Sequence, residues 1–373
     1  MMVGGIFLAG CVSSAAIVPA PRQAQPAHQP TRSVAGTVTV PIGPPVRSAV
    51  PAPAPAASRD PGFRRPPAGL DDRIASLWRA FPGKTGIAVQ RIDGEWALSQ
   101  RGGELFPQQS VSKLWVAMSI LDAVDNGRVR LDQKVRIGPE DLVVFHQPLA
   151  NRVRAEGSVS MSVRELIETA ITQSDNLAND SLLRTVGGPN AVRAFISKKD
   201  LGSIRFGPGE RLLQSGTAGL TWQQSYSVGR NFQAARSALP AATRKAAMDN
   251  YLANPVDGAS PAAIASALTR LARGSLLSHD STDFLLGVMS RTKSGPQRLK
   301  AGLPAGWTFV HKTGTGQDLN GLTAGYNDIG IATAPDGTRY AIVVMMGTTT
   351  SSIPARMALM QAVSGAVAEF HGK

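Results

Sequence analysis

The segment Trp307-Thr-Phe-Val-His-Lys-Thr-Gly314 lies in the stretch that decides the fold of this chain. Residues 307–312 predict a strand, and two further strand patterns follow at 321–333 and 339–346. Pro335-Asp336-Gly337 lies between the last two patterns and is a strong turn signal. Three strands are therefore expected to close the fold.

Two shorter strands are expected early in the folded region, at 86–92 and 96–99, and helical patterns fill the space between the two groups. An amphipathic helix is predicted over 70–81, and a long apolar helix runs from Ser110 to a stop at Gly127. Ser162 and Glu165 form a capping box for a helix over 162–173. Further helical patterns cover 177–186, 189–198, 261–273, 282–291 and 353–370.

These elements predict an α+β fold of the α/β/α sandwich type over residues 70–373. One five-stranded antiparallel sheet would receive strands from both ends of the chain and be flanked by helices, while the middle helices form an all-α lobe. A site between the two lobes would collect segments that are distant in sequence. We therefore expect the active site there.

Composition narrows the class of protein. The chain has 373 residues, 43% of them hydrophobic and 17% charged, which is ample for a globular core. Its net charge is +13, yet no basic stripe interleaved with aromatic residues is evident, so no nucleic-acid partner is expected. The five histidines show no ligand spacing, so neither a metal nor another cofactor is expected. We expect a monomer.

Residues 1–69 differ in character from the rest. Cys11 follows Leu8-Ala-Gly and a short apolar run, so residues 1–18 predict a lipoprotein-type signal segment with lipidation at Cys11. No Lys or Arg precedes Cys11, which leaves an ordinary cleaved secretory signal as an alternative. Residues 19–69 are rich in Pro and Ala and predict a disordered linker. A periplasmic protein, lipid-anchored to the outer membrane, is the expectation.

The first catalytic candidates come from Ser110-Val-Ser-Lys113. A serine becomes a nucleophile when a base lies nearby, and residues three apart share one face of a helix. The helix N-terminus also stabilises negative charge that develops there. The N–H groups of Ser110 and Thr315 are expected to form an oxyanion hole.

Two more short motifs complete the candidate site. Ser174-Asp-Asn176 offers a hydroxyl that can pass a proton to a leaving amine, and an amide that can orient a lysine and hold a substrate carbonyl. Alone, this motif is more typical of a capped loop than of a catalytic site. Lys312 and Thr313 offer a cation and a hydroxyl to a substrate carboxylate, and Gly314 lets the substrate approach the backbone.

The order Ser-x-x-Lys, Ser-Asp-Asn, Lys-Thr-Gly resembles the class A serine β-lactamases and their penicillin-binding relatives. The run Gly295-Pro-Gln-Arg-Leu-Lys-Ala-Gly-Leu-Pro-Ala-Gly-Trp-Thr-Phe-Val-His-Lys-Thr-Gly-Thr-Gly316 closely resembles the class A approach to the Lys-Thr-Gly strand. The resemblance spans roughly residues 70–373. It implies acyl transfer through a serine ester, with a β-lactam as the small-molecule substrate.

The resemblance also implies deacylation residues. Class A enzymes carry a loop glutamate in a Glu-x-x-Leu-Asn motif, which activates the hydrolytic water, and Glu210-Arg-Leu-Leu-Gln214 matches it. Gln214 replaces the usual Asn and adds a methylene, so the water is expected to sit slightly differently. The base for acylation is left open between Lys113 and Glu210 acting through a water.

Other positions depart from the family pattern. Leu322 stands where an Arg for the substrate carboxylate often lies, and Arg298 matches an earlier position that some members use. Phe145 falls where an aromatic gatekeeper usually flanks the site, and His311 replaces a frequent Asp. Residues 215–258 are interpreted as an insertion, which would act as a lid, serve as a partner surface or be inert.

The sequence therefore predicts a class A-like β-lactamase with Ser110, Lys113, Ser174 and Glu210 as its catalytic residues. A D,D-peptidase or penicillin-binding protein acting on peptidoglycan stem peptides is the first alternative, which Gln214 keeps open. A non-hydrolytic lipoprotein that binds the cell wall is the second. A binding module has no need of the complete catalytic set, which argues against the second alternative.

Overall fold

The computed structural model describes residues 65–93 and 96–373. The predicted signal segment with Cys11 and most of the predicted linker lie outside these residues, so lipid anchoring and a periplasmic location stay predictions. Helix α1 begins at Leu70, where the folded domain is expected to begin. Within the described ranges, no helix has the length and apolar character that a membrane span requires.

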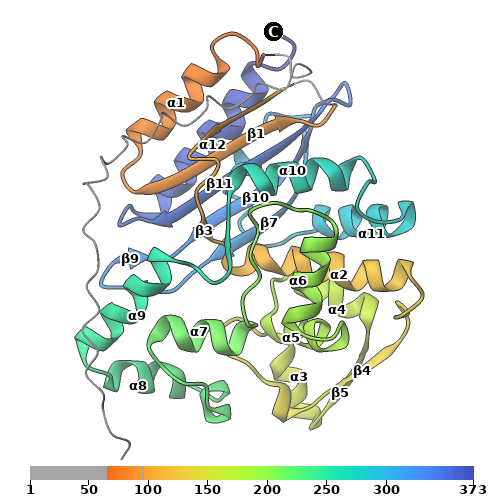
Figure 1. Ribbon diagram of the computed structural model, residues 1–373, viewed down its shortest axis with the longest axis vertical. Helices are drawn as coiled ribbons and strands as arrows, with labels where there is room; N and C mark the ends of the chain where they lie inside the picture. The colour runs from red at the N-terminus through yellow and green to blue at the C-terminus, as the bar shows by residue number, and fades with distance from the viewer. Residues whose placement is uncertain (1–64, 94–95) are drawn as a thin grey trace, which may run out of the picture. The chain divides into compact units, whose positions relative to one another are not determined.

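A five-stranded sheet with the strand order β2-β1-β11-β10-β7 forms the upper part of the molecule in Figure 1. Every neighbouring pair is antiparallel, and β1 pairs with β11 along its whole length. Strands from both ends of the folded region thus meet in one sheet, which confirms the predicted fold class. The strands are β1 Lys84–Arg91, β2 Ala97–Gln100, β7 Thr308–Thr315, β10 Tyr326–Thr333 and β11 Arg339–Thr348.

The sheet is apolar on both faces because side chains alternate along its central strands. In β11, Ile342 and Val344 join a buried cluster with Leu70 of α1 and Met360 of α12. Their neighbour Val343 points the other way, into the larger core that contains α2 and α10. Helices therefore cover both faces, as the sandwich prediction requires. These helices are α1 Leu70–Ala80, α12 Ile353–Glu369, α10 Pro261–Ala272 and α11 His279–Ser290.

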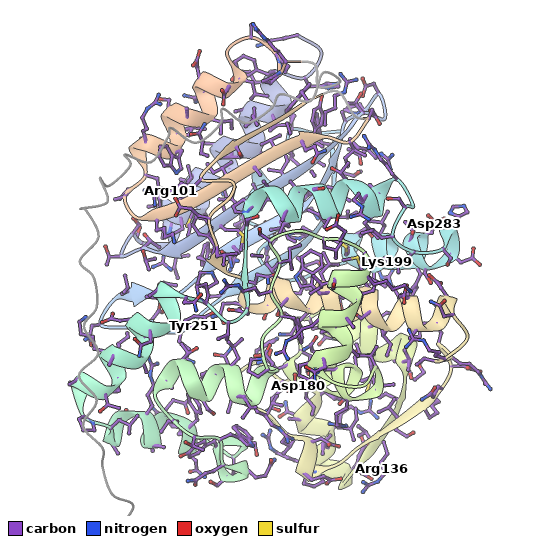
Figure 2. All side chains as sticks on the ribbon, viewed as in Figure 1. Arg101, Arg136, Asp180, Lys199, Tyr251 and Asp283 are labelled. Atoms are coloured by element: carbon purple, nitrogen blue, oxygen red, sulfur yellow. The ribbon has the colours of Figure 1, made fainter. Side chains whose placement is uncertain are left out.

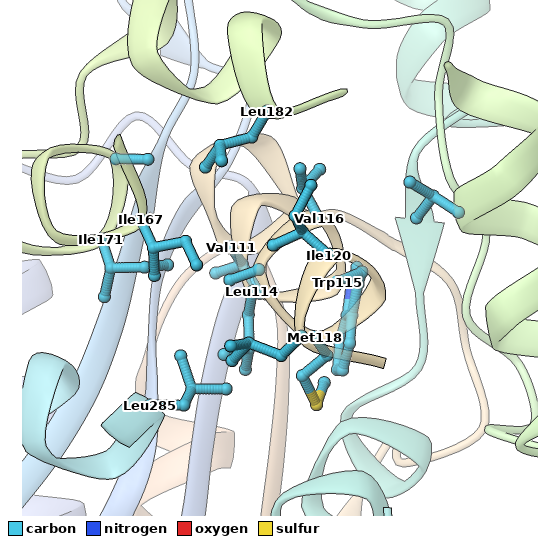
Figure 3. Close-up of a cluster of buried hydrophobic side chains, with 14 of the residues drawn as sticks. Val111, Leu114, Trp115, Val116, Met118, Ile120, Ile167, Ile171, Leu182 and Leu285 are labelled. Atoms are coloured by element: carbon cyan, nitrogen blue, oxygen red, sulfur yellow. The ribbon is translucent and has the colours of Figure 1, made fainter. Parts of the chain in front are cut away.

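Helix α2, Lys113–Asp125, runs through the centre of the larger core (Figure 3). Leu114, Trp115 and Met118 are fully buried, and Ile167 and Leu285 from other helices lie around them. A helix that is apolar on all sides is held by packing on every face, so its N-terminal end has a fixed position. The candidate nucleophile is attached to that end.

The lower lobe in Figure 1 is mainly helical. It also contains the ribbon β4 Lys134–Ile137 paired with β5 Val159–Ser162, which was not predicted from the sequence. The short pair β3 Phe106–Pro107 and β6 Gly258–Ala259 lies at the junction with the sheet. The remaining helices are α3 Leu149–Glu156, α4 Val163–Thr172, α5 Asn176–Thr185, α6 Pro189–Lys198, α7 Glu210–Ala218, α8 Asn231–Ala238 and α9 Ala241–Ala253.

Two predicted elements differ in form from those observed. The strand expected over 321–333 is divided into β9, Leu322–Thr323, and β10, since Gly325 between them adopts a φ of 103°. β9 pairs with β8, Asp318–Leu319, in a small hairpin. The helix expected to begin at Ser110 opens as the 3-10 turn η1, Gln109–Ser112, and becomes α-helical at Lys113.

Candidate active site

Ser110 lies in the turn η1, between β3 and α2. Asn327 on β10 holds this turn from behind: its Nδ2 donates to the carbonyl oxygens of Pro107 at 2.8 Å and Gln108 at 3.1 Å. Gly314 lies against the same turn, where a Cβ would come within 2.3 Å of the Gln108 carbonyl oxygen. The nucleophile turn is thus clamped to the sheet, and the glycine of Lys-Thr-Gly is needed for the close approach.

Lys113 is the centre of the site. Its side chain is buried, and Nζ donates to Ser110 Oγ at 3.0 Å, Asn176 Oδ1 at 2.9 Å and Glu210 Oε1 at 2.5 Å. An ammonium has three protons to donate, and each has an acceptor here. One buried cation thus links the candidate nucleophile, the Asn of Ser-Asp-Asn and the candidate deacylation carboxylate.

The Ser-Asp-Asn motif is both a helix cap and part of the site. Asp175 caps α5 by accepting from Ala178 N–H at 2.8 Å, and it also accepts from Leu149 N–H at 2.7 Å. Ser174, just before it, has a φ of 59°, which side-chain-bearing residues rarely adopt. The structural and chemical interpretations of this motif are therefore compatible, since the cap orients the residues on either side of it.

Lys312 is fully buried opposite Ser174. Its Nζ donates to Ser174 Oγ and to the Thr313 carbonyl, each at 2.9 Å. Burial, with the nearby charges of Lys113 and Arg298, holds the pKa of Lys312 well below its usual range. An incoming carboxylate would relieve this repulsion and stabilise the protonated form.

Glu210 is the first residue of helix α7, so the expectation that it lies on a loop is wrong. Gly209 precedes the helix with a φ of 95°, which turns the chain into it. Besides its contact with Lys113, Glu210 accepts at Oε2 from Gln214 Nε2 at 3.2 Å. Both residues are buried. Because they are four residues apart on one helix, the side-chain amide of Gln214 lies beside the carboxylate of Glu210.

Arg298 is a buried brace that reaches the pocket wall. Its Nη1 donates to the carbonyl oxygens of Gly314 and Asn327, at 3.2 and 2.6 Å, and Nη2 donates to Thr315 Oγ1 at 2.7 Å. The guanidinium also lies 3.8 Å from the ring centre of Tyr326. Arg298 is therefore a buried residue of the site rather than an exposed surface residue.

A pocket of about 390 Å³ lies over these groups. Phe145 stands at its rim, 41% exposed, with a φ of 61° and its ring edge-on to Phe232 at 5.0 Å. Leu322 is absent from the pocket wall, while Arg298 is present. The predicted site residues that line it are Ser110, Phe145, Ser174, Asn176, Glu210, Gln214, Arg298, Thr313 and Thr315. Lys113 and Lys312 lie behind this wall.

His311 faces away from the pocket, into the core. Its Nδ1 lies 2.8 Å from Asp328 Oδ1, and the other carboxylate oxygen of Asp328 accepts from Leu299 N–H at 3.1 Å. The pair links β7 and β10 to the segment that follows Arg298. His311 therefore supports the strand of Lys312 from the side opposite the pocket.

Several polar residues at the site were missed by sequence reasoning. Gln317 donates from Nε2 to both Gln214 oxygens, each at 2.9 Å, and Gln109 Oε1 accepts from Gln214 Nε2 at 3.2 Å. Glutamines on a turn or strand end are ordinary surface residues in most proteins. The only available signal was that Gln109 directly precedes the nucleophile.

A serine held by a buried lysine, beside a second serine–lysine pair and a carboxylate, defines a serine hydrolase of the acyl-transfer type. Residues 69–370 match the model of the β-lactamase enzyme family (Beta-lactamase2), and the chain belongs to that family. This finding confirms the resemblance found in the sequence.

Individual relatives of the chain are also β-lactamases. The chain is 27% identical to the β-lactamase VEB-1 of Pseudomonas aeruginosa, over 74% of this chain and 81% of that one. It is 28% identical to the extended-spectrum β-lactamase PER-1 of Pseudomonas aeruginosa, over 82% and 88%. Among solved structures, the TLA-3 extended-spectrum β-lactamase matches with a TM-score of 0.67 at 27% identity, over 82% of this chain and 99% of that one. A β-lactamase from Chitinophaga pinensis DSM 2588 matches with a TM-score of 0.66 at 27% identity, over 81% and 98%.

Proposed function

We propose that this protein hydrolyses β-lactams through an ester on Ser110 and that water activated by Glu210 then cleaves the ester. The observation that carries the proposal is the position of Lys113, whose Nζ contacts Ser110 Oγ, Asn176 Oδ1 and Glu210 Oε1 at once. Membership of the β-lactamase enzyme family supports the same reaction.

In acylation, Ser110 Oγ attacks the carbonyl carbon of the strained ring. Lys113 passes a proton to Glu210, becomes neutral and takes the proton of Ser110, since it is in direct contact with both groups. Ser174 gives its hydroxyl proton to the leaving ring nitrogen, and the proton taken from Ser110 replaces it. The N–H groups of Ser110 and Thr315 hold the oxyanion, and the substrate carboxylate binds near Lys312, Thr313 and Arg298.

Before deacylation, Glu210 returns to Lys113 the proton that it accepted during acylation. Glu210 then removes a proton from a water that attacks the ester carbonyl. Lys113 gives a proton to Ser110, which leaves as a hydroxyl, and Lys113 regains a proton from Glu210. Gln214 supports this step because its Nε2 donates to Glu210 Oε2. That hydrogen bond directs the second carboxylate oxygen while Lys113 directs the first. The carboxylate is therefore oriented before the substrate arrives.

The test is steady-state hydrolysis of a chromogenic cephalosporin by the purified full chain. Ser110→Ala is expected to abolish turnover and to form no adduct detectable by intact-mass spectrometry. Glu210→Gln removes the negative charge that favours protonated Lys113, so neutral Lys113 remains accessible as the base for acylation. The variant is expected to acylate and then accumulate one covalent adduct per chain. Normal turnover by Glu210→Gln, with no adduct, would exclude Glu210 as the deacylation base.

One observation favours the alternative of a D,D-peptidase or penicillin-binding protein. The amide oxygen of Gln214 accepts from Gln317 Nε2, which occupies a group that would otherwise be available to the hydrolytic water. If wild-type protein releases one equivalent of chromophore and then stops, acylation without deacylation is shown. Release of the terminal D-alanine from a stem pentapeptide would then be the activity to measure.

A further inference from the structure

The segment 215–258 places a side chain behind the candidate site. Its helix α9 packs on α7, where Leu213, Met248 and Tyr251 share a small buried cluster. Tyr251, labelled in Figure 2, lies near the C-terminal end of α9. Because this side chain is buried, its hydroxyl needs hydrogen-bond partners within the protein.

Those partners are the residue before the nucleophile and a buried carboxylate. The hydroxyl of Tyr251 accepts from Gln109 Nε2 at 2.6 Å and donates to Asp257 Oδ1 at 2.9 Å. The second oxygen of Asp257 accepts from the backbone N–H of Gln109 at 2.8 Å. The three residues thus close a ring of hydrogen bonds directly behind Ser110.

Hydrogen bonds connect Asp257 through Tyr251, Gln109 and Gln214 to Glu210. The carboxylates at the two ends of this chain fix the direction of every hydrogen bond in it. A carboxylate only accepts, so the proton of Tyr251 goes to Asp257, and Gln109 must offer its NH2 to the phenol oxygen. The carbonyl of Gln109 then faces Gln214, whose NH2 donates to it and to Glu210. A flipped Gln109 amide would set two NH2 groups against each other and release Gln214 from its place.

The backbone at this point also needs support. Gln109 has a φ of 53°, a conformation that a residue with a side chain keeps only where its surroundings hold it. Its backbone N–H and both polar atoms of its side chain have partners. The ring around Tyr251 provides two of these three contacts.

We propose that Tyr251 is a positioning residue for deacylation, so that the segment 215–258 is part of the catalytic machinery. This inference rests on the proposed function. Tyr251 acts through Gln109 and Gln214 on Glu210 and touches no reacting atom. The hydrogen bond between Lys113 and Ser110 lies outside this chain of contacts, so acylation should depend on the phenol less than deacylation does.

The experiment compares Tyr251→Phe with wild type in the full chain. Loss of one buried hydroxyl is expected to slow deacylation about tenfold. The rate of acylation, measured by stopped flow, should stay within about twofold of the wild-type rate. A change of that size is smaller than the loss of one hydrogen bond would cause. Because only the later step slows, kcat and KM fall together, kcat/KM is kept, and acyl-enzyme accumulates in intact-mass spectra.

Tyr226→Phe is the matched control. Tyr226 belongs to the same segment and contacts Phe232 edge-on, yet no hydrogen bond of its hydroxyl is present among the described residues. Its removal is expected to leave kcat and KM unchanged. Gln109→Met removes the same contacts from the other side, and it should reproduce the Tyr251→Phe kinetics if that variant fails to fold.

The outcomes are distinguishable. Wild-type kinetics in Tyr251→Phe overturn the inference and leave the proposed function intact. A fall in kcat/KM without adduct indicates general damage to the fold and also overturns it. If wild type itself shows no turnover, the proposed function fails first and this inference fails with it.

Discussion

The two halves of the candidate site are built from different chemistry. One half, which we call the charged half, consists of side chains that carry charge or exchange protons: Ser110, Lys113, Ser174, Glu210 and Lys312. The other, the amide half, is a hydrogen-bonded group behind the nucleophile: Gln109, Gln214, Gln317, Tyr251 and Asp257. Short motifs specify most of the charged half, whereas no short motif joins the residues of the amide half.

The two halves need different conditions to keep their geometry. A buried charge without a partner is costly, so the charged half depends on complete pairing. Most hydrogen bonds of the amide half join neutral groups, which contribute little each, and Asp257 is its charged acceptor. The amide half therefore depends on the direction of its hydrogen bonds. Glu210 belongs to the charged half and also ends the amide half, so under the proposed function deacylation should need both halves.

The largest effect is expected from Lys113→Met, which removes the cation at the centre of the charged half. Glu210 would be left as a buried charge without its ion-pair partner, and the free energy of unfolding should fall by about 3–5 kcal/mol. Adding Glu210→Gln removes that charge and should restore much of the loss. Urea unfolding of both variants measures this, and a cost below about 1 kcal/mol for Lys113→Met would contradict the pairing argument.

Asp257→Asn tests the carboxylate of the amide half. Burial raises the pKa of Asp257 from 3.8 to about 6. Between these two pH values the folded state holds a proton on Asp257 that the unfolded state has released. The free energy of unfolding should therefore rise as the pH falls through about 6, by about 2 kcal/mol from this group between pH 7.5 and 4.5.

Burial and the charge of Glu210 also raise the pKa of Asp180 to about 6, and burial raises the pKa of Asp175, so Asp257 is one of several groups that contribute to the wild-type pH dependence. In the Asp257→Asn variant, the free energy of unfolding should lose the pH dependence that comes from Asp257 and keep the part that comes from Asp180. Unfolding in urea at the two pH values measures both. An unchanged pH dependence in the variant would show that Asp257 does not titrate in this range.

Gln214→Asn sharpens the comparison, because it converts the motif to the form usual in class A enzymes. The shorter side chain cannot keep its contacts to Gln109, Glu210 and Gln317 together. We expect deacylation to slow about tenfold, the size of one lost hydrogen bond. Faster deacylation, measured from the decay of the acyl-enzyme, would instead show that the extra methylene is a defect.

The smallest effect is expected at Phe145, which belongs to neither half. Phe145→Gly loses the contact with Phe232 but relieves a φ of 61°, so stability should change by less than about 1 kcal/mol. Phe145→Ala keeps the strain and should be the less stable of the two. Thermal melts rank the variants, and KM for substrates with bulky side chains shows whether the ring acts as a gate.

The sheet and the charged half were predictable because both follow local patterns. Alternating apolar residues and Pro335-Asp336-Gly337 indicate the strands, and motif spacing identifies Lys113 and Lys312. The placement of Glu210 at a helix N-terminus was not predicted, because α7 is short and its start depends on the positive φ of Gly209. A hydrogen bond such as that between Tyr251 and Gln109 joins residues far apart in sequence, and no periodicity marks it.

The pairing of β1 with β11 has a consequence for how the chain folds. Arg91 lies opposite Tyr340, so the first strand of the sheet can complete its hydrogen bonds only when nearly the whole chain has emerged from the ribosome. Contacts between such distant residues form slowly, because a long loop must close before any stabilisation is gained. The synthesised chain therefore passes through a long interval without its central sheet, and truncation before β11 should leave a product that proteases degrade.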